Sequence, residues 1–304
     1  MRSTFIRSLT KFASQDSDIM LLTGDLGFNV LENFEKNFPS QFLNCGIAEQ
    51  NMMGMAAGLA SEGKKVFVYS IANFPTFRCL EQIRNDICYH NFPVTIVSIG
   101  AGFSYGSLGY SHHAVEDIAI MRSLPGLRLL SPNDPFEVEE CMQIIIKNPL
   151  PTYLRLGKDG EPNIINSSKL NIKGLNFLNE KFDNLILSTG PISNQCFKIV
   201  NKLNTEIEKK FTFATITQLK PIEIKAVDLK IFKRIVTIEE HSLIGGLGST
   251  INDFVIKNNL KMDILNIGIS EYDQHEMGST EYLRQVHGLD QKSIFEKINN
   301  FIKN

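Results

Sequence analysis

Several residues stand at spacings that could carry chemistry. Glu49 follows a glycine turn in the segment CGIAEQN, and Phe74 and Phe77 are spaced to share one helical face. Two adjacent histidines, His112 and His113, end a glycine-rich segment. Each has a simpler explanation, since acidic residues favour helix N-termini and aromatic pairs often pack in a core. A functional interpretation therefore depends on whether one fold brings these groups together.

Two further charged residues occupy positions suited to ligand contact. Arg155 lies in the apolar run YLRLG. A guanidinium fork suits carboxylate or phosphate groups, although Arg155 could also simply close a salt bridge. Asp25, in TGDLG, is the second candidate, with a turn residue as the alternative.

The elements that would position these residues alternate along the chain. Strand-like apolar runs occur at 19–23, 66–70, 94–99, 127–130, 185–188, 211–217, 234–239 and 262–267. Helical spacing occupies 48–61, 76–90, 115–124, 135–147 and 245–258. This alternation predicts two doubly wound α/β domains with mainly parallel sheets, at 1–165 and 180–304, joined by a polar connection. Ligands are then expected in loops after strand carboxyl ends, where the residues above lie.

Composition narrows the classes of function. The chain has 304 residues, 43% of them hydrophobic and 21% charged, with a net charge of −2, so no nucleic-acid partner is expected. No apolar run approaches the roughly 18 residues of a membrane helix, so no membrane partner is expected. The five cysteines are scattered without a CxxC pair, which favours a reducing cytoplasm and neither a disulfide framework nor a zinc site.

The stretch GIAEQNMMGMAAGLASEGKKVFVYS resembles one shared by transketolases, deoxyxylulose-phosphate synthases and the β chains of 2-oxo-acid dehydrogenases. The resemblance implies thiamine diphosphate as cofactor, with Glu49 contacting N1′ of its aminopyrimidine. It implies an aromatic wall for that ring, formed by Phe74 and Phe77, and places Asp25 near the cofactor. Arg78 would then reach a phosphate or a partner chain.

The segment SHH, followed by VEDIAIMRSLPG, is similar to the substrate-histidine segment of the transketolase family. By this resemblance His112 is the active-site histidine that hydrogen-bonds substrate, with His113 as a second candidate. Arg155 and Arg2 match arginines that bind the distal anion of a sugar phosphate. The later segments VTIEEHSLIGGLGSTINDF and LNIGISEY resemble the C-terminal domain of the same enzymes, which is mostly scaffold and dimer contact.

The resemblance also identifies what the chain lacks. No G-D-G motif with a downstream asparagine, which holds the diphosphate and Mg²⁺ in full-length transketolases, occurs here in suitable surroundings. A separate diphosphate-binding subunit with that motif is therefore expected to supply the metal ligands. We expect a heterotetramer with two copies of each chain and a homodimeric contact, inactive without the partner.

The implied activity is transfer of a two-carbon ketol unit to a sugar or sugar-derivative acceptor. Two departures from the family pattern argue against ordinary pentose phosphates as substrates. Leu108 replaces an aspartate that hydrogen-bonds a substrate hydroxyl, and Gly100 replaces a second substrate histidine. One alternative is the β subunit of a thiamine enzyme that uses 2-oxo acids, either a dehydrogenase or an acyl-transfer synthase. Another is a non-catalytic paralogue, against which the presence of Glu49, Phe74 and His112 argues.

Overall fold

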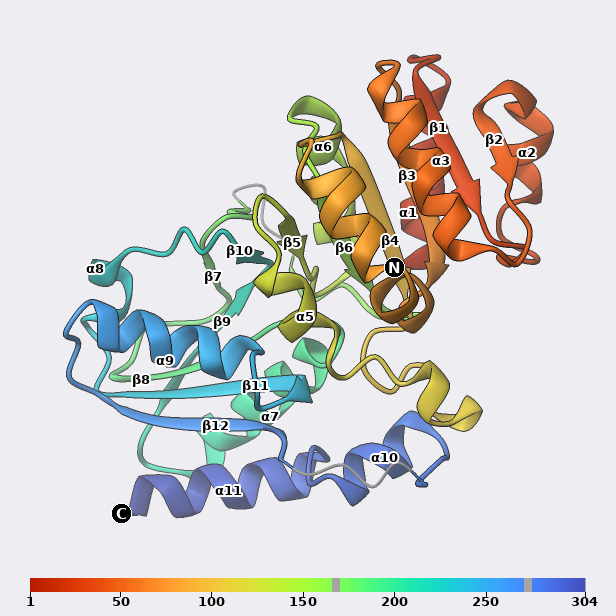
Figure 1. Ribbon diagram of the computed structural model, residues 1–304. Coiled ribbons are helices and arrows are strands. Elements are labelled where there is room, and N and C mark those ends of the chain that lie inside the picture. The colour runs from red at the N-terminus through yellow and green to blue at the C-terminus, as the bar shows by residue number, and fades with distance from the viewer. Residues whose placement is uncertain (166–169, 271–274, 304) are drawn as a thin grey trace.

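The computed structural model describes residues 1–165, 170–270 and 275–303. The chain forms two α/β lobes, each built around one sheet (Figure 1). The first sheet has seven strands in the order β10-β5-β6-β4-β3-β1-β2, and the second has five in the order β12-β11-β8-β9-β7. All pairings are parallel except β10 with β5 and β7 with β9. This confirms the predicted fold of two mainly parallel sheets.

The first sheet comprises β1 (Ile19–Thr23), β2 (Phe42–Asn44), β3 (Lys65–Ile71), β4 (Val94–Ile99), β5 (Arg128–Leu130), β6 (Thr152–Leu156) and β10 (Gln218–Lys220). Its helices are α1 (Arg2–Ala13), α2 (Glu32–Asn37), α3 (Glu49–Ser61), α4 (Leu80–Gln82), α5 (Asp117–Ser123) and α6 (Pro135–Lys147). The central strands β3, β4 and β6 are buried along most of their length, because helices cover both faces of a parallel sheet.

The second sheet comprises β7 (Leu175–Phe177), β8 (Asn184–Ser188), β9 (Phe211–Ile216), β11 (Arg234–Ser242) and β12 (Asp263–Ile269). Its helices are α7 (Ser193–Glu206), α8 (Ala226–Leu229), α9 (Leu247–Lys257), α10 (Thr280–Val286) and α11 (Gln291–Lys303). In Figure 1, α9 lies on one face of this sheet and α7 and α11 lie on the other.

The two lobes share a strand. β10 comes from the second half of the sequence, yet Gln218 pairs with Leu130 at the edge of the first sheet. β7 begins at Leu175, earlier than the expected start of the second domain at 180. The domain boundaries 1–165 and 180–304 therefore remain predictions, and the polypeptide passes between the lobes more than once.

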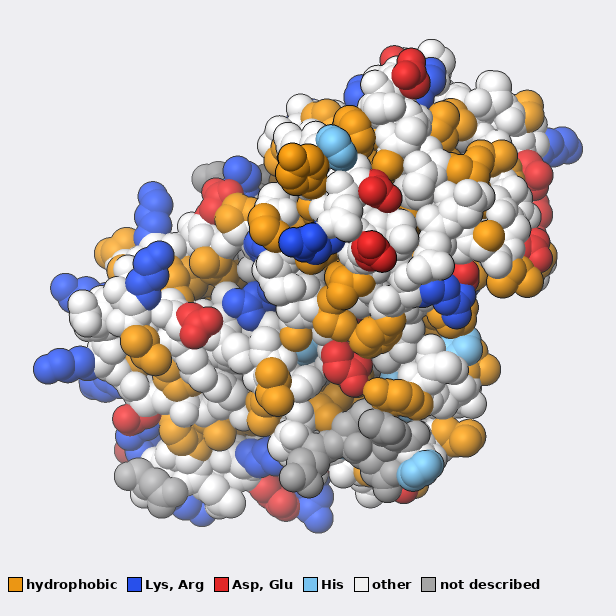
Figure 2. Space-filling model, viewed as in Figure 1, with side chains coloured by type: hydrophobic (Ala, Val, Ile, Leu, Met, Phe, Trp, Pro, Cys, Tyr) orange, Lys and Arg blue, Asp and Glu red, His pale blue; other side chains and the backbone are white. Residues whose placement is uncertain are grey.

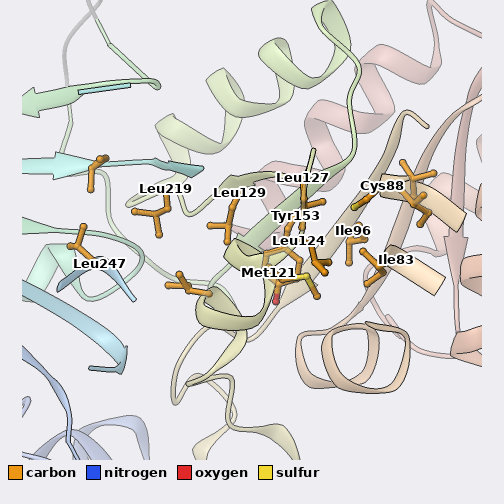
Figure 3. Close-up of a cluster of buried hydrophobic side chains, with 14 of the residues drawn as sticks. Ile83, Cys88, Ile96, Met121, Leu124, Leu127, Leu129, Tyr153, Leu219 and Leu247 are labelled. Atoms are coloured by element: carbon orange, nitrogen blue, oxygen red, sulfur yellow. The ribbon is translucent and has the colours of Figure 1, made fainter. Parts of the chain in front are cut away.

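A continuous hydrophobic core joins the lobes. One cluster of buried side chains contains Leu129 and Tyr153 of the first sheet together with Leu219 and Leu247 of the second half (Figure 3). Close packing of such a cluster removes apolar surface from water on both sides at once. The two halves are consequently held in one arrangement, which fixes the loops that meet at their junction.

Hydrophobic and charged side chains are interspersed over the face of Figure 2, and several exposed apolar residues belong to loops at strand ends. These include Ile47, Phe77, Leu108 and Tyr110. Within the described ranges, no helix is long and apolar enough to cross a membrane.

Candidate functional site

The expected site residues follow the carboxyl ends of adjacent parallel strands. β1 is followed by Asp25, β2 by Glu49, β3 by the turn with Phe74, and β4 by the loop with His112. Because β1, β2, β3 and β4 are parallel neighbours, these loops open at one edge of the sheet. The order of the strands thus brings together residues far apart in the sequence.

Glu49 is the first residue of α3 and its side chain is only 3% exposed. Its carboxylate lies at the helix N-terminus, where the backbone dipole favours negative charge. Beside it Ile47 is 80% exposed, so the chain passes from surface to interior within two residues. A buried carboxylate at the mouth of a loop cluster is suited to hold one specific hydrogen-bond partner.

A π-helical turn, Phe74–Arg78, follows β3. Phe74 is half-buried and Phe77 is 48% exposed, so their rings do not behave as core residues. The guanidinium of Arg78 contacts the Glu49 carboxylate, with an Nη1–Oε2 distance of 2.6 Å. It also lies over the Phe74 ring, 5.1 Å from the ring centroid. The turn therefore places the Phe74 ring beside the Arg78–Glu49 ion pair.

A hollow of about 500 Å³ adjoins this turn. Its walls are Asn73, Phe74, Phe77, Arg78, Tyr110, Ser111 and Glu116. Asn73 fixes the opposite wall, because its amide nitrogen donates to the backbone oxygens of Tyr110, Ser111 and His113 at 2.8–3.3 Å. Burial is the main cause that raises the pKa of Glu116 above its usual value.

His112 belongs to this loop and is partly exposed. Its ring meets the edge of the Phe74 ring at 5.4 Å between centroids, and its Nδ1 lies 2.9 Å from the Ser111 hydroxyl. Burial, and next the neighbouring His113, lowers the pKa of His112, so the ring is neutral near pH 7. A neutral imidazole can donate or accept one hydrogen bond to a substrate.

His113 has a different environment. It is fully buried, its Nε2 lies 3.0 Å from the backbone oxygen of Gly106, and its ring meets Phe103 edge-on. His112 ends a short 3-10 turn and is partly exposed, whereas the next residue, His113, is buried, so only one of the two histidines faces the opening. The structure thus places the His113 ring inside the loop, against Gly106 and Phe103, and its predicted contact with substrate stays a prediction.

Arg155 also lies inside the protein and is 1% exposed. Its Nε donates to Asp117 Oδ2 at 2.8 Å, and its Nη2 donates to the backbone oxygens of Ala114 and Glu240 at 2.8 and 3.3 Å. All these partners are at the junction of the lobes. The Arg155 guanidinium thus joins the two lobes through a buried carboxylate, and its predicted contact with a substrate anion stays a prediction.

Asp25 and Asn44 order the loop that precedes Glu49. Asp25 has a positive φ of 55°, and its amide donates to Asn44 Oδ1 at 3.0 Å. Asn44 Nδ2 returns a bond of 3.1 Å to the Asp25 carboxylate, and Gly46 N also donates to Asn44 Oδ1. Asp25 thus lies at the same edge as Glu49 and is exposed.

The remaining expected residue, Arg2, is the first residue of α1. The positive charge of Arg2 near Tyr69 and Tyr105 partly offsets the burial that raises the pKa of both phenols, and its buried Nε has no hydrogen-bond partner among the described residues. Lys158, which sequence reasoning missed, lies over the Tyr105 ring at 5.4 Å from the centroid. Its only sequence signal was its position two residues after β6, at the edge where ligands bind.

Tyr105 explains the absence of a side chain at position 100. Gly100 has a φ of +101°, and a Cβ there would lie 2.3 Å from the Tyr105 ring. An imidazole at that position would require the ring to move and the backbone to adopt a strained conformation. Tyr105 therefore occupies the space that opens beside Gly100, which is a second residue that sequence reasoning missed.

At the glycine-rich start of α9, the backbone amides bind a side chain of the same protein, Glu239. The carboxylate of Glu239 accepts from Leu247 N at 2.7 Å and from Gly248 N at 2.8 Å, and a Cβ at Gly246 would collide with it. A buried carboxylate on free helix amides is what the N-terminal dipole favours. The side chain of Glu239 thus fills the position at which an anionic ligand would otherwise meet this helix.

Taken together, two α/β domains with a carboxylate, aromatic rings and a histidine at one strand edge define a pyrimidine-binding class of protein. The transketolase pyrimidine-binding domain matches residues 1–161, and the transketolase C-terminal domain matches residues 174–294. The chain therefore belongs to the transketolase family.

Individual relatives extend this result over nearly the whole chain. An apulose-4-phosphate transketolase subunit of Phocaeicola vulgatus is 32% identical, covering 99% of this chain and 97% of that protein. A 6-deoxy-6-sulfo-D-fructose transketolase subunit of a Clostridium species is 28% identical, covering 97% and 92%. A solved split-gene transketolase, described as an inactive beta4 tetramer, superposes with a TM-score of 0.85 at 29% identity, covering 98% and 96%.

The transketolase family implies thiamine diphosphate, and the residues present fit its aminopyrimidine. The observation that tests this is the Arg78 guanidinium, a flat cation that already contacts both the Glu49 carboxylate and the Phe74 face. A flat heteroaromatic ring with N–H groups needs those two surfaces. Among the described residues, no group of three or more His, Cys, Asp or Glu side chains could hold a metal ion.

Proposed function

We propose that this chain is the pyrimidine-binding subunit of a two-chain, thiamine-diphosphate-dependent transketolase that transfers a two-carbon ketol unit to a sugar or sugar-derivative acceptor. The observation that carries the proposal is the buried Glu49 carboxylate beside the Phe74 ring at the edge of a parallel sheet. Relatives of nearly the same length that are named as transketolase subunits support the division of the enzyme into two chains.

Within that enzyme, Glu49 would hold N1′ of the aminopyrimidine, and Phe74 with Phe77 would form the wall for the ring. The cofactor, when bound, supplies the carbanion chemistry, and the protein supplies position and proton placement. Glu49 can share a proton at that contact because little water reaches it. His112, neutral near pH 7, would donate or accept a hydrogen bond at a substrate oxygen, and Asp25 would order the loop before Glu49.

The partner chain would provide the G-D-G motif, the diphosphate site and the Mg²⁺ ligands. Exposed apolar residues around the opening, including Ile47, Phe77, Leu108 and Tyr110, provide surface that a partner can cover. We place the complete enzyme in the cytoplasm as a heterotetramer with two copies of each chain, in keeping with five free cysteines.

A substrate with a terminal anion suits the surroundings of Tyr105. Arg2 has a buried unpartnered Nε among the described residues, and Lys158 lies over the same tyrosine ring. Two cations on one aromatic side chain favour a phosphate or sulfonate, since guanidinium and ammonium groups bind both. The names of two relatives, apulose-4-phosphate and 6-deoxy-6-sulfo-D-fructose transketolase subunits, also indicate ketoses that carry such a group.

The usual pentose phosphates are expected to be poor substrates. Leu108 is 53% exposed on a turn of the same loop and cannot hydrogen-bond a sugar hydroxyl, and Tyr105 fills the space beside Gly100. A sugar hydroxyl that finds no hydrogen-bond partner in the site can lower the preference for that sugar by several kcal/mol. Leu108→Asp should therefore raise activity on xylulose 5-phosphate with ribose 5-phosphate.

The test is reconstitution with a diphosphate-binding chain that carries the G-D-G motif. The pair is assayed with thiamine diphosphate and Mg²⁺ against ketose phosphates, sulfonated ketoses, nucleotide-linked sugars and pyruvate. Ketol transfer by the pair, with none by either chain alone, supports the proposal. Turnover by the single chain, or pyruvate as the only accepted donor, contradicts it.

A further inference from the structure

The position of Arg78 relative to Glu49 and Phe74 has a consequence for cofactor entry. The guanidinium contacts the buried carboxylate at 2.6 Å and lies over the aromatic face at 5.1 Å. These are the two surfaces proposed for the aminopyrimidine, namely a carboxylate for a ring nitrogen and an aromatic face for the ring plane. The guanidinium of Arg78 and the aminopyrimidine are both flat and both carry N–H donors, so the same site accommodates either of them.

The guanidinium and the aminopyrimidine cannot occupy this site at the same time. Glu49 is 3% exposed and lies at the start of a helix, so its carboxylate offers few free directions. The Phe74 ring also makes a T-shaped contact with the His112 ring, at 5.4 Å between centroids. A ring nitrogen that bonds to the Glu49 carboxylate would need the position that the Arg78 guanidinium holds at 2.6 Å.

We propose that Arg78 occupies the aminopyrimidine position of the unassembled subunit and must leave it before the cofactor binds. This inference rests on the proposed function and concerns one residue of that site. Arg78 is able to move, because its side chain is 49% exposed and belongs to a short π-helical turn. Glu116 lines the same hollow and offers a second carboxylate to the displaced guanidinium.

The occupied state protects the subunit before assembly. Without Arg78, a carboxylate would be buried with no counter-charge at a surface that also exposes Ile47 and Phe77. The ion pair satisfies Glu49 until the partner chain and the cofactor replace it. The chain therefore binds its cofactor against a competing intramolecular contact.

One test compares Arg78→Met with Arg84→Met in the assembled pair. Arg84 is an exposed arginine of the same segment whose side chain hydrogen-bonds Asn85, so it is a matched control. Loss of a half-exposed ion pair and a cation–π contact should tighten thiamine diphosphate binding about fivefold and raise its association rate. Arg84→Met should change neither value. Weaker or unchanged binding in Arg78→Met overturns the inference.

A second measurement uses the parent protein and needs no variant to fold. The reaction of Arg78 with phenylglyoxal is followed by peptide mass spectrometry in the assembled pair, with and without thiamine diphosphate. Cofactor should raise the modification rate of Arg78 and leave that of Arg84 unchanged; protection of Arg78 by cofactor contradicts the inference. If the parent pair binds no cofactor, the proposed function itself fails; if it binds cofactor and the cofactor protects Arg78, only the inference fails.

Discussion

The hydroxyl of Tyr153 lies 3.0 Å from the hydroxyl of Thr76, between the two phenylalanines of the π-helical turn. The same hydroxyl accepts from Ser98 at 2.7 Å and donates to Asp117 Oδ2 at 3.0 Å. Asp117 in turn binds Arg155, whose Nη2 reaches the backbone of Glu240. A buried chain of hydrogen bonds therefore runs from the aromatic turn to the second lobe.

Tyr153→Phe should lower both stability and cofactor affinity. The change removes the hydroxyl that three buried groups share, at a cost of about 1–3 kcal/mol. Thermal unfolding of the single chain and cofactor titration of the assembled pair measure the two effects, with the exposed Tyr89→Phe as control. A destabilised variant that binds cofactor with unchanged affinity would show that the network does not position the turn.

Phe74→Ala should weaken thiamine diphosphate binding by about 1–3 kcal/mol, because the ring loses one aromatic face. Phe28, which is 72% exposed outside the hollow, provides the control Phe28→Ala. Titration of the assembled pair measures the affinity. Unchanged affinity together with a lower melting temperature would identify Phe74 as a packing residue.

Arg155→Met should destabilise the chain by about 3–5 kcal/mol, since it leaves the Asp117 carboxylate buried without its cation. Arg7→Met is a matched control, because Arg7 and Glu139 form an exposed pair that contributes at most about 1 kcal/mol. Urea denaturation measures both variants. A stable Arg155→Met protein with a raised KM for an anionic substrate would instead support the predicted substrate role of Arg155.

Two buried groups at the junction should give opposite pH dependences. Burial raises the pKa of Glu239 to about 7 and lowers the pKa of His241 to about 4. The Glu239 contribution to stability is full below pH 4.5 and is lost as the pH rises through about 7. The His241 contribution is full above pH 6.5 and is lost as the pH falls through about 4.

Between about pH 4.5 and 6.5 these two contributions nearly cancel in the parent protein. Relative to the parent, Glu239→Gln should gain stability with rising pH, by about 1.4 kcal/mol per unit. His241→Gln should lose stability with rising pH by a similar amount. Free energies of unfolding across this range measure the slopes; equal slopes for both variants would refute the assignment.

Local signals predicted much of the fold. The sequence Asn133-Asp134-Pro135 predicted the start of a helix, and Asp134 indeed accepts from Glu137 N at 2.9 Å at the start of α6. The strand 94–99 was predicted with the bounds of β4. Such elements are fixed by neighbouring residues, through capping groups and apolar period, and these are visible in one stretch of sequence.

Features that depend on distant partners were not predictable in the same way. The segment 76–90 was expected to be one helix, but α4 there lies between two π-helical turns, Phe74–Arg78 and Ile83–Cys88. β10 joins the sheet of the other lobe. Arg155 has the same local sequence whether it faces a ligand or Asp117, so only the tertiary fold distinguishes the two.

The residues of the candidate site also fall into those that local motifs predicted and those that depend on distant contacts. Glu49, Phe74 and His112 were identified from their motifs, and the structure places them in one region. Lys158 and Tyr105 were missed, because their grouping with Arg2 brings together the start of α1 and two separate loops. Arg78 was expected to contact a phosphate or a partner, and its ion pair with Glu49 was not foreseen.

The most direct test of the proposed function is exchange of the C2 proton of thiamine diphosphate in the assembled pair, compared between the parent and Glu49→Gln. Glutamine fills the same volume and keeps the assembly folded, but it cannot share a proton with N1′ as a carboxylic acid does. Exchange measured by deuterium quench-flow should fall by several orders of magnitude, while cofactor remains bound. Exchange at the parental rate in Glu49→Gln, with cofactor bound, would contradict the central claim that this chain supplies the activating carboxylate.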